Sequence, residues 1–222
     1  MAPYRGGARP AGDCRVESDC LGELPVPARA LYGIQTERAI RNFPITGVRI
    51  SHYPEFIKSL ACIKKAAALA NQRLGLLDEA RAKAICAACD QLLEGKHRGH
   101  FRVDVIQGGA GTSTNMNANE VIANLALQVL GRPRGDYGFL HPNNHVNLSQ
   151  STNDVYPTAI RLTLLTMGRE LHAAMGCLAD SLAAKGREFA KVIKIGRTQM
   201  QDAVPMTLGQ EFHAWAGMVG ED

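Results

Sequence analysis

The longest regular pattern in this sequence is a stripe of apolar residues between positions 158 and 189. These residues recur at alternating spacings of four and three, which predicts one long α-helix with a single apolar face. A helix of about 30 residues is far longer than the globular mean of about 11–12. It cannot bury its stripe against itself, so we expect it to belong to a bundle of comparable helices. The stripe consists of Ile160, Leu164, Met167, Leu171, Ala174, Leu178 and Leu182.

Shorter apolar stripes of the same period predict four further helices. Asp78 and Thr207 are expected to cap two of them, because a side-chain oxygen just before an apolar run accepts a hydrogen bond from the first helical turn. Glycine lies at or just after the end of the first three, as is typical of helix C-termini. The expected ranges are 56–74, 78–93, 117–131 (beginning near Asn117 or Asn119) and 207–220.

Strand signals are few in the rest of the chain. Short apolar runs at 48–50 and 192–195 are the candidates, and residues 15–35 are expected to be extended because their prolines exclude a helix. We therefore expect a mainly α fold. Residues 1–14 are rich in glycine, proline and arginine, and we expect them to form a disordered extension.

Composition and charge narrow the possible functions. The chain has 222 residues, of which 45% are hydrophobic and 5% aromatic, as is typical of a soluble globular protein. The net charge of +4 is spread along the chain, so no nucleic-acid partner is expected. No apolar stretch is long enough for a membrane span, and the N-terminus shows no export signal. Six irregularly spaced cysteines indicate reduced thiols and a cytoplasmic protein.

Two of the cysteines raise the question of a metal site. Cys86 and Cys89 are spaced as in many zinc sites, and His97 and His100 follow them. Both cysteines, however, lie within a helical stripe, where thiols pack well as small hydrophobic groups. The histidines fall in a polar loop beyond Gly95. We therefore expect core packing here and no metal site.

Three polar segments carry the candidate chemistry. The first, 107–124, joins a glycine-rich turn to a helix with many asparagines, and neutral donors beside a helix N-terminus suit an anionic ligand. Alone, the turn would be explained by glycines with positive φ. The second, 141–154, has more asparagine, serine and threonine than a capped loop requires. The third, 196–205, is expected to be a loop leading into a helix, and it adds Thr198 and Gln199.

At these three segments the sequence resembles the aspartase/fumarase superfamily. The resemblance extends from about Val16 to the C-terminal end, and three long motifs occur in family order. Within the superfamily, the chain is most similar to the aspartate ammonia-lyases. The matching runs are GGAGTSTNMNANEVIANLAL, HPNNHVNLSQSTNDVYPTAIRL and KIGRTQMQDAVPMTLGQEF.

The resemblance also implies a domain organisation. Residues 15–150 would form the N-terminal lyase domain, and residues 151–222 the beginning of the central helical bundle through which family subunits pair into a homotetramer. The family's third motif, a GSSxxPGKxNP loop that carries the serine base, does not occur in this sequence. We therefore expect a truncated chain that holds no catalytic base and is inactive alone.

The resemblance assigns roles to individual side chains. Family members remove a proton from the carbon next to a carboxylate and expel ammonia or water from the neighbouring carbon, without a cofactor. Preorganised donors stabilise the negative charge that develops on the carboxylate. The expected partner is thus a small dicarboxylate such as L-aspartate or fumarate. By the motif match, its carboxylates would be bound by Thr112, Ser151, Thr152, Asn153 and Thr198.

Gln199 separates the candidate reactions. Class II fumarases carry histidine at this position, whereas one branch of aspartases carries glutamine. A neutral amide cannot shuttle a proton at neutral pH, which suits the loss of an already protonated amine. The HPNN run at 141–144 is nearer the fumarase pattern, so a class II fumarate hydratase stays open as an alternative. A non-catalytic, lyase-like protein that acts only by association is a third possibility.

Overall fold

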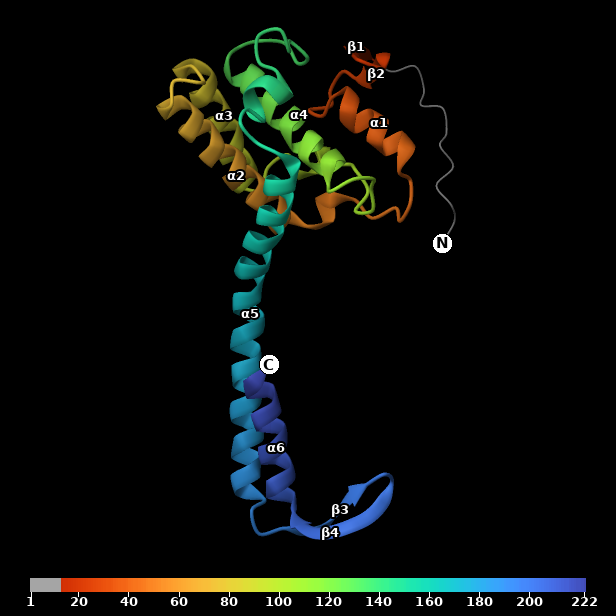
Figure 1. Cartoon of the computed structure of the whole chain (residues 1–222), viewed down its shortest axis with the longest axis vertical. Coiled ribbons are helices and arrows are strands. Elements are labelled where there is room, and N and C mark those ends of the chain that lie inside the picture. Colours follow the sequence, from red (N-terminus) through yellow and green to blue (C-terminus); the bar gives the residue numbers. More distant parts are fainter. Residues whose placement is uncertain (1–12) are drawn as a thin grey trace. The chain divides into compact units, whose positions relative to one another are not determined.

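The computed structural model describes residues 13–222, and most of this part of the chain is helical (Figure 1). The mainly α fold expected from the sequence is confirmed. Three single helical turns, η1 (Ile50–His52), η2 (Arg98–His100) and η3 (Pro142–Val146), lie in the connections. The α-helices are α1 (Ile34–Asn42), α2 (Pro54–Arg73), α3 (Glu79–Leu93), α4 (Thr112–Val129), α5 (Thr152–Glu188) and α6 (Leu208–Glu221).

Two antiparallel hairpins accompany the helices within residues 13–222. β1 (Cys14–Asp19) pairs with β2 (Gly22–Pro27), and β3 (Ile193–Thr198) pairs with β4 (Gln201–Thr207). Residues 1–12 of the expected disordered extension lie outside the described part of the chain, and its last residue, Cys14, begins β1.

Only one of the two candidate strand runs forms a regular strand. The run at 192–195 coincides with the start of β3, whereas 48–50 contributes an isolated bridge between Arg49 and Asp104. Segment 196–205 was expected to be a loop leading into a helix, and this expectation is wrong, since β3 and β4 occupy it. Both strands present mostly exposed residues, so they carry little of the apolar alternation that identifies a strand.

The predicted helix caps are confirmed. Asp78 accepts a hydrogen bond from the backbone N–H of Arg81 at 3.0 Å, at the start of α3. At α6, the Thr207 hydroxyl accepts from the N–H of Gln210 at 3.1 Å, while the Gln210 side chain accepts from the N–H of Thr207 at 2.9 Å. These reciprocal bonds satisfy donors that the first helical turn leaves free.

α4 begins at Thr112, earlier than the expected start near Asn117 or Asn119. The preceding residue, Gly111, has a left-handed backbone with φ of +83°, and no side-chain cap of its own. Gln107 replaces the cap from outside the helix, because its Oε1 accepts from the backbone N–H of Thr114 at 2.8 Å. The asparagines do not break the helix, because the amides of Asn117 and Asn124 donate to the loop carbonyls of His100 and Leu31; Asn124 also donates to the α4 carbonyl of Glu120 at 3.1 Å.

The long helix α5 also begins earlier than predicted, at Thr152 and not at Thr158, and it contains Pro157. Pro157 is the sixth residue of the helix, so its missing N–H costs one intrahelical hydrogen bond, the one to the carbonyl of Asn153. Ser151 supports the start of the helix, since its hydroxyl accepts from the N–H of Asn153 at 3.2 Å. The expected start at Thr158 was therefore six residues too late, because the helix continues through Pro157.

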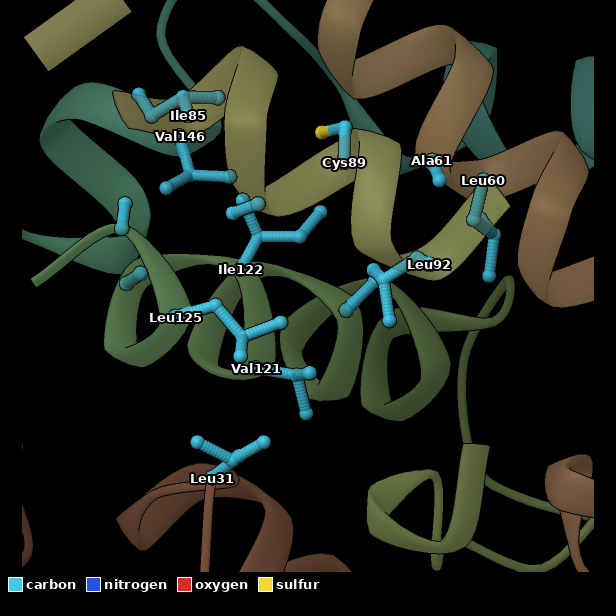
Figure 2. Close-up of a cluster of buried hydrophobic side chains, with 14 of the residues drawn as sticks. Leu31, Leu60, Ala61, Ile85, Cys89, Leu92, Val121, Ile122, Leu125 and Val146 are labelled. Atoms are coloured by element: carbon cyan, nitrogen blue, oxygen red, sulfur yellow. The ribbon is translucent and has the colours of Figure 1, made fainter. Parts of the chain in front are cut away.

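The hydrophobic core lies among α2, α3 and α4. Figure 2 shows side chains of these helices pointing towards one another, with Leu31 beneath α4. α4 is buried along most of its length, which explains how it can carry both apolar and amide side chains without a solvent face. Fully buried members of this core include Leu60, Ala61, Ile85, Cys89, Leu92, Val121 and Ile122.

Cys89 belongs to this core, so the expected core packing of its thiol is confirmed. The side chain is fully buried, and burial raises the pKa of its thiol well above the usual range. Among the described residues, no group of three or more His, Cys, Asp or Glu is placed to hold a metal ion. No helix of the described residues is long and apolar enough to cross a membrane.

The chain divides into two compact units, which meet inside α5. The first runs to Thr163, and the second begins at Leu164 and holds the rest of α5, the β3–β4 hairpin and α6. In the second unit the ring of Phe189, directly after α5, packs against Phe212 of α6 with centroids 5.5 Å apart. Much of the predicted apolar stripe of α5 is exposed, for instance Leu171 at 63%.

Candidate functional site

The glycine-rich turn before α4 is held closed by one glutamine. Gln107 Nε2 donates to the Thr114 hydroxyl at 2.6 Å, and Gln107 Oε1 accepts from the Thr114 N–H at 2.8 Å. Gly109 and Gly111 both adopt positive φ, as a tight turn at this point requires. Thr112 follows directly as the first residue of α4 and is exposed, so its hydroxyl is accessible to a ligand.

The second polar segment is a loop that turns from η3 into α5. Asn147 Nδ2 donates to the carbonyl of Gln150 at 3.1 Å, and Gln150 Nε2 donates to the carbonyl of Val146 at 2.9 Å. These bonds leave Ser151 and Asn153 exposed at the beginning of α5. The amides in this segment therefore shape the loop, and the hydroxyl and amide groups after it are presented outward.

The two polar segments meet in the first unit. Asn115 Nδ2, on α4, donates to the hydroxyl of Thr152 at 2.9 Å. An open cavity of about 370 Å³ lies between the turn and the start of α5, and Asn153 lines it. The other lining residues are Val105, Ile106, Gln107, Gly109, Ala110, Gly111, Tyr156 and Pro157.

The described lining of this cavity is uncharged and mostly apolar, and its polar side chains are those of Gln107, Asn153 and Tyr156. None of its described lining residues carries a charge at neutral pH, since burial raises the pKa of the Tyr156 phenol. Thr112, Ser151 and Thr152 do not line the cavity themselves, but the lining residues Gly111 and Asn153 lie directly beside Thr112 and Thr152 in the chain. Neutral donors at a helix N-terminus bind an anion without paying to desolvate a counter-charge.

Thr198 and Gln199 lie together at the tip of the β3–β4 hairpin, in the second unit (Figure 1). Gln199 and Met200 have φ of +50° and +62°, as in a two-residue hairpin turn with left-handed central residues. Thr198, Gln199 and Met200 are all exposed. The hairpin thus presents a hydroxyl and an amide at an exposed tip.

Asn115 and Lys64 are parts of the site that the sequence-based site prediction omitted. Asn115 binds Thr152, and Lys64, fully buried on α2, donates to Asn147 Oδ1 at 2.8 Å. A signal for Lys64 was present, because it lies four residues after Leu60 and so on the apolar face of its helix. A lysine on a buried face requires a polar partner.

The family described as Lyase matches residues 22–222, and the chain belongs to it. The chain is 59% identical over 213 residues to an aspartate ammonia-lyase of Pseudomonas aeruginosa, covering 96% of this chain and 45% of that protein. It is 49% identical to an aspartate ammonia-lyase of Escherichia coli, again covering 96% and 45%. The chain thus spans about half the length of the curated relatives it matches.

Solved structures agree with this membership. A fumarate lyase:delta crystallin of Brucella melitensis is 58% identical with a TM-score of 0.87, covering 93% of this chain and 47% of that one. A class II fumarase of Schistosoma mansoni is 38% identical with a TM-score of 0.84, covering 94% and 44%. The resemblance to the aspartase/fumarase superfamily that the three motifs indicated is confirmed.

Proposed function

We propose that this chain forms part of an aspartate ammonia-lyase, which converts L-aspartate to fumarate and ammonia. The observation that carries the proposal is the meeting of the 107–115 and 151–153 segments around one cavity without charged walls. The identity of 59% to an aspartate ammonia-lyase supports this reaction over others of the family. The substrate-binding residues we propose are Thr112, Ser151, Thr152, Asn153, Thr198 and Gln199.

The hydrogen-bond donors of the site and a base outside the cavity have separate roles in the reaction. Hydroxyl and amide hydrogens hold the substrate carboxylates and stabilise the charge that develops when the neighbouring carbon loses its proton. The described cavity lining offers no carboxylate, imidazole, thiol or amine to take up that proton. The base is therefore contributed from outside this cavity, and we expect the 222-residue chain alone to be inactive.

The assembly we propose is a homotetramer in the cytoplasm. Exposed apolar side chains along the second-unit part of α5, such as Leu164 at 65% and Leu171 at 63%, support pairing with other helices. The six cysteines, all unpaired in the described residues, support a reducing compartment.

A fumarate hydratase is the second candidate, favoured by the likeness to a class II fumarase with a TM-score of 0.84. Gln199 opposes it, because an amide does not transfer protons at neutral pH. A change of Gln199→His tests this residue directly.

A chimera tests the proposal, with this chain replacing the matching segment of the Pseudomonas aeruginosa relative. Purified chimera and unchanged chain are each given L-aspartate or L-malate, and fumarate is followed by its absorbance. We expect the chimera to deaminate aspartate, and its Gln199→His variant to lose aspartate activity relative to malate activity. Conversion of malate with aspartate left untouched would overturn the proposal in favour of a hydratase. Fumarate formed from aspartate by the 222-residue chain alone would overturn the expectation that it is inactive.

A further inference from the structure

A single lysine is buried among neutral side chains behind the candidate site. Lys64 has no exposed surface, and its Nζ donates to Asn147 Oδ1 at 2.8 Å. No carboxylate of the described residues lies within ion-pair distance of it. The neighbouring Lys65 contrasts with this, because it is partly exposed and paired with Asp90. Burial of a cation without a counter-charge is costly, so the position of Lys64 calls for a functional explanation.

The ammonium of Lys64 fixes the direction of the amide that it meets. An ammonium group has only donors, so Asn147 must turn its Oδ1 towards Nζ. The opposite end of this amide, Nδ2, then donates to the carbonyl of Gln150 at 3.1 Å. Asn147 Oδ1 also accepts from Asn115 Nδ2 at 3.1 Å and from Asn119 Nδ2 at 3.2 Å. One carbonyl oxygen thus gathers three donors.

The direction of the Asn115 amide follows from that of Asn147. Because Asn147 presents an acceptor, Asn115 must turn its Nδ2 towards it, and the second hydrogen of that nitrogen goes to the hydroxyl of Thr152 at 2.9 Å. The Asn115 Oδ1 is left buried without a partner. Such an orphaned acceptor is costly, which indicates that the amide is held in this orientation by its neighbours.

Thr152 is the outer end of the chain of hydrogen bonds. Its oxygen accepts from Asn115, so its own hydrogen is left to donate, and the described residues supply no acceptor for it. We propose that Lys64 is a positioning residue that fixes which group donates and which accepts in this series of hydrogen bonds, so that Thr152 presents a hydroxyl hydrogen to a substrate carboxylate. That the ligand is a carboxylate rests on the proposed function, whereas the order of donors and acceptors follows from the hydrogen bonds alone.

The order of donors and acceptors in the hydrogen bonds from Lys64 to Thr152 depends on the charge of Lys64. Burial lowers the pKa of Lys64 to about 7. A neutral amine has a lone pair that can accept, so deprotonation removes the constraint on Asn147. Other titratable groups on the surrounding elements are Cys89 on α3, Glu120 on α4, and His141 and His145 around η3. Burial raises the pKa of Glu120 to about 7 and lowers those of both histidines below 6.5.

An NMR titration of the unliganded 222-residue chain tests the proposal. We expect the side-chain amide signals of Asn147 and Asn115 and the backbone amide of Thr152 to shift with the midpoint of Lys64 Nζ, near pH 7. In Lys64→Met this titration disappears from all three signals, and that of Glu120 survives. Lys65→Met, the matched control, leaves the three signals unchanged. A packing role alone would not link these signals to one ionisation.

Two further measurements complete the test. In Lys64→Met, amide exchange at Val155 is expected to rise about tenfold, because the start of α5 loses its ordering contact, with α3 unchanged. If Lys64→Met does not fold, Glu120→Gln is titrated instead. The signals of Asn147, Asn115 and Thr152 must then still shift with the midpoint of Lys64, because Glu120 no longer titrates. The proposal is overturned if Thr152 does not follow the ionisation of Lys64, or if its titration survives in a folded Lys64→Met. An inactive chimera with an intact Lys64 titration would reject only the proposed lyase activity.

Discussion

Asp104 anchors the loops that lead into the glycine turn, and its replacement by asparagine tests how much this anchor contributes. Oδ1 accepts from the Thr46 hydroxyl and the Ile106 N–H, each at 2.8 Å. Oδ2 accepts from the N–H groups of Thr46 and Gly47, also at 2.8 Å. All four partners are donors, and Ile106 lines the cavity of the candidate site. The carboxylate therefore ties two loops together beside that cavity.

The expected loss follows from the acceptors that asparagine lacks. One amide oxygen at the Oδ2 position can retain the bonds from Thr46 and Gly47, while the NH₂ group can donate to the Thr46 hydroxyl but leaves the Ile106 N–H without an acceptor. Bonds to a charged group contribute about 1.5–3 kcal/mol each, and the relief of burying a charge offsets part of this. We expect Asp104→Asn to lower the free energy of unfolding by about 3 kcal/mol. Urea unfolding at neutral pH, followed by circular dichroism, measures this difference.

The pH dependence identifies the cause of the loss. Desolvation by burial raises the pKa of Asp104, but the hydrogen bonds to Ile106, Thr46 and Gly47 outweigh it, and the pKa lies below its usual 3.8. The stabilisation is therefore present above pH 3.8 and is lost as the pH falls through the lowered pKa. The difference between variant and wild type must shrink in strong acid.

A matched control is Asp136→Asn, which breaks a surface pair with Arg132 at 2.9 Å. Exposed pairs contribute about 0.2–1 kcal/mol, so its effect should be small. If Asp104→Asn costs no more than this control, or if its cost is the same in acid, the account of Asp104 as an anionic anchor is wrong.

Three further changes have defined outcomes. Gly111→Ala forces a side chain onto a φ of +83° and against the Tyr156 ring, and should cost about 2 kcal/mol or more in urea unfolding; a neutral effect would contradict the geometry. Burial raises the pKa of Glu120 from 4.5 to about 7, so its contribution to stability is lost as the pH rises between these values. Glu120→Gln should remove that slope, measured by unfolding across this range. Thr207→Ala, which breaks the capping box with Gln210, should cost about 1 kcal/mol in the second unit; an unchanged thermal transition would refute it.

The helices could be predicted because their apolar periodicity and their caps are local properties of the sequence. The 78–93 prediction coincides with α3 and its Asp78 cap, and α6 follows Thr207 as expected. The starts of α4 and α5 could not be predicted in this way. The cap of α4 comes from the side chain of Gln107, and the start of α5 tolerates Pro157. Neither effect is visible in a helical repeat.

The candidate site was predicted in its polar segments but not in its supporting residues. The bond from Asn115 to Thr152 joins side chains 37 positions apart, and Lys64 reaches Asn147 across 83 positions. Such contacts depend on how α2 and α4 pack, which no spacing in the chain determines. The extended conformation predicted for residues 15–35 agrees with β1 and β2, but the pairing of these strands and helix α1 were missed for a related reason. Arg15 holds this region by donating to backbone carbonyls, such as that of Ala30 at 2.8 Å.

Helix α4 has a consequence for how the first unit is made on the ribosome. Glu120 accepts from the N–H of Gly33, 87 positions earlier, and Asn124 donates to the carbonyl of Leu31, 93 positions earlier. The segment around α1 therefore emerges long before its partners exist. We infer that it waits unfolded until translation has passed α4, and that the first unit then forms in one late step.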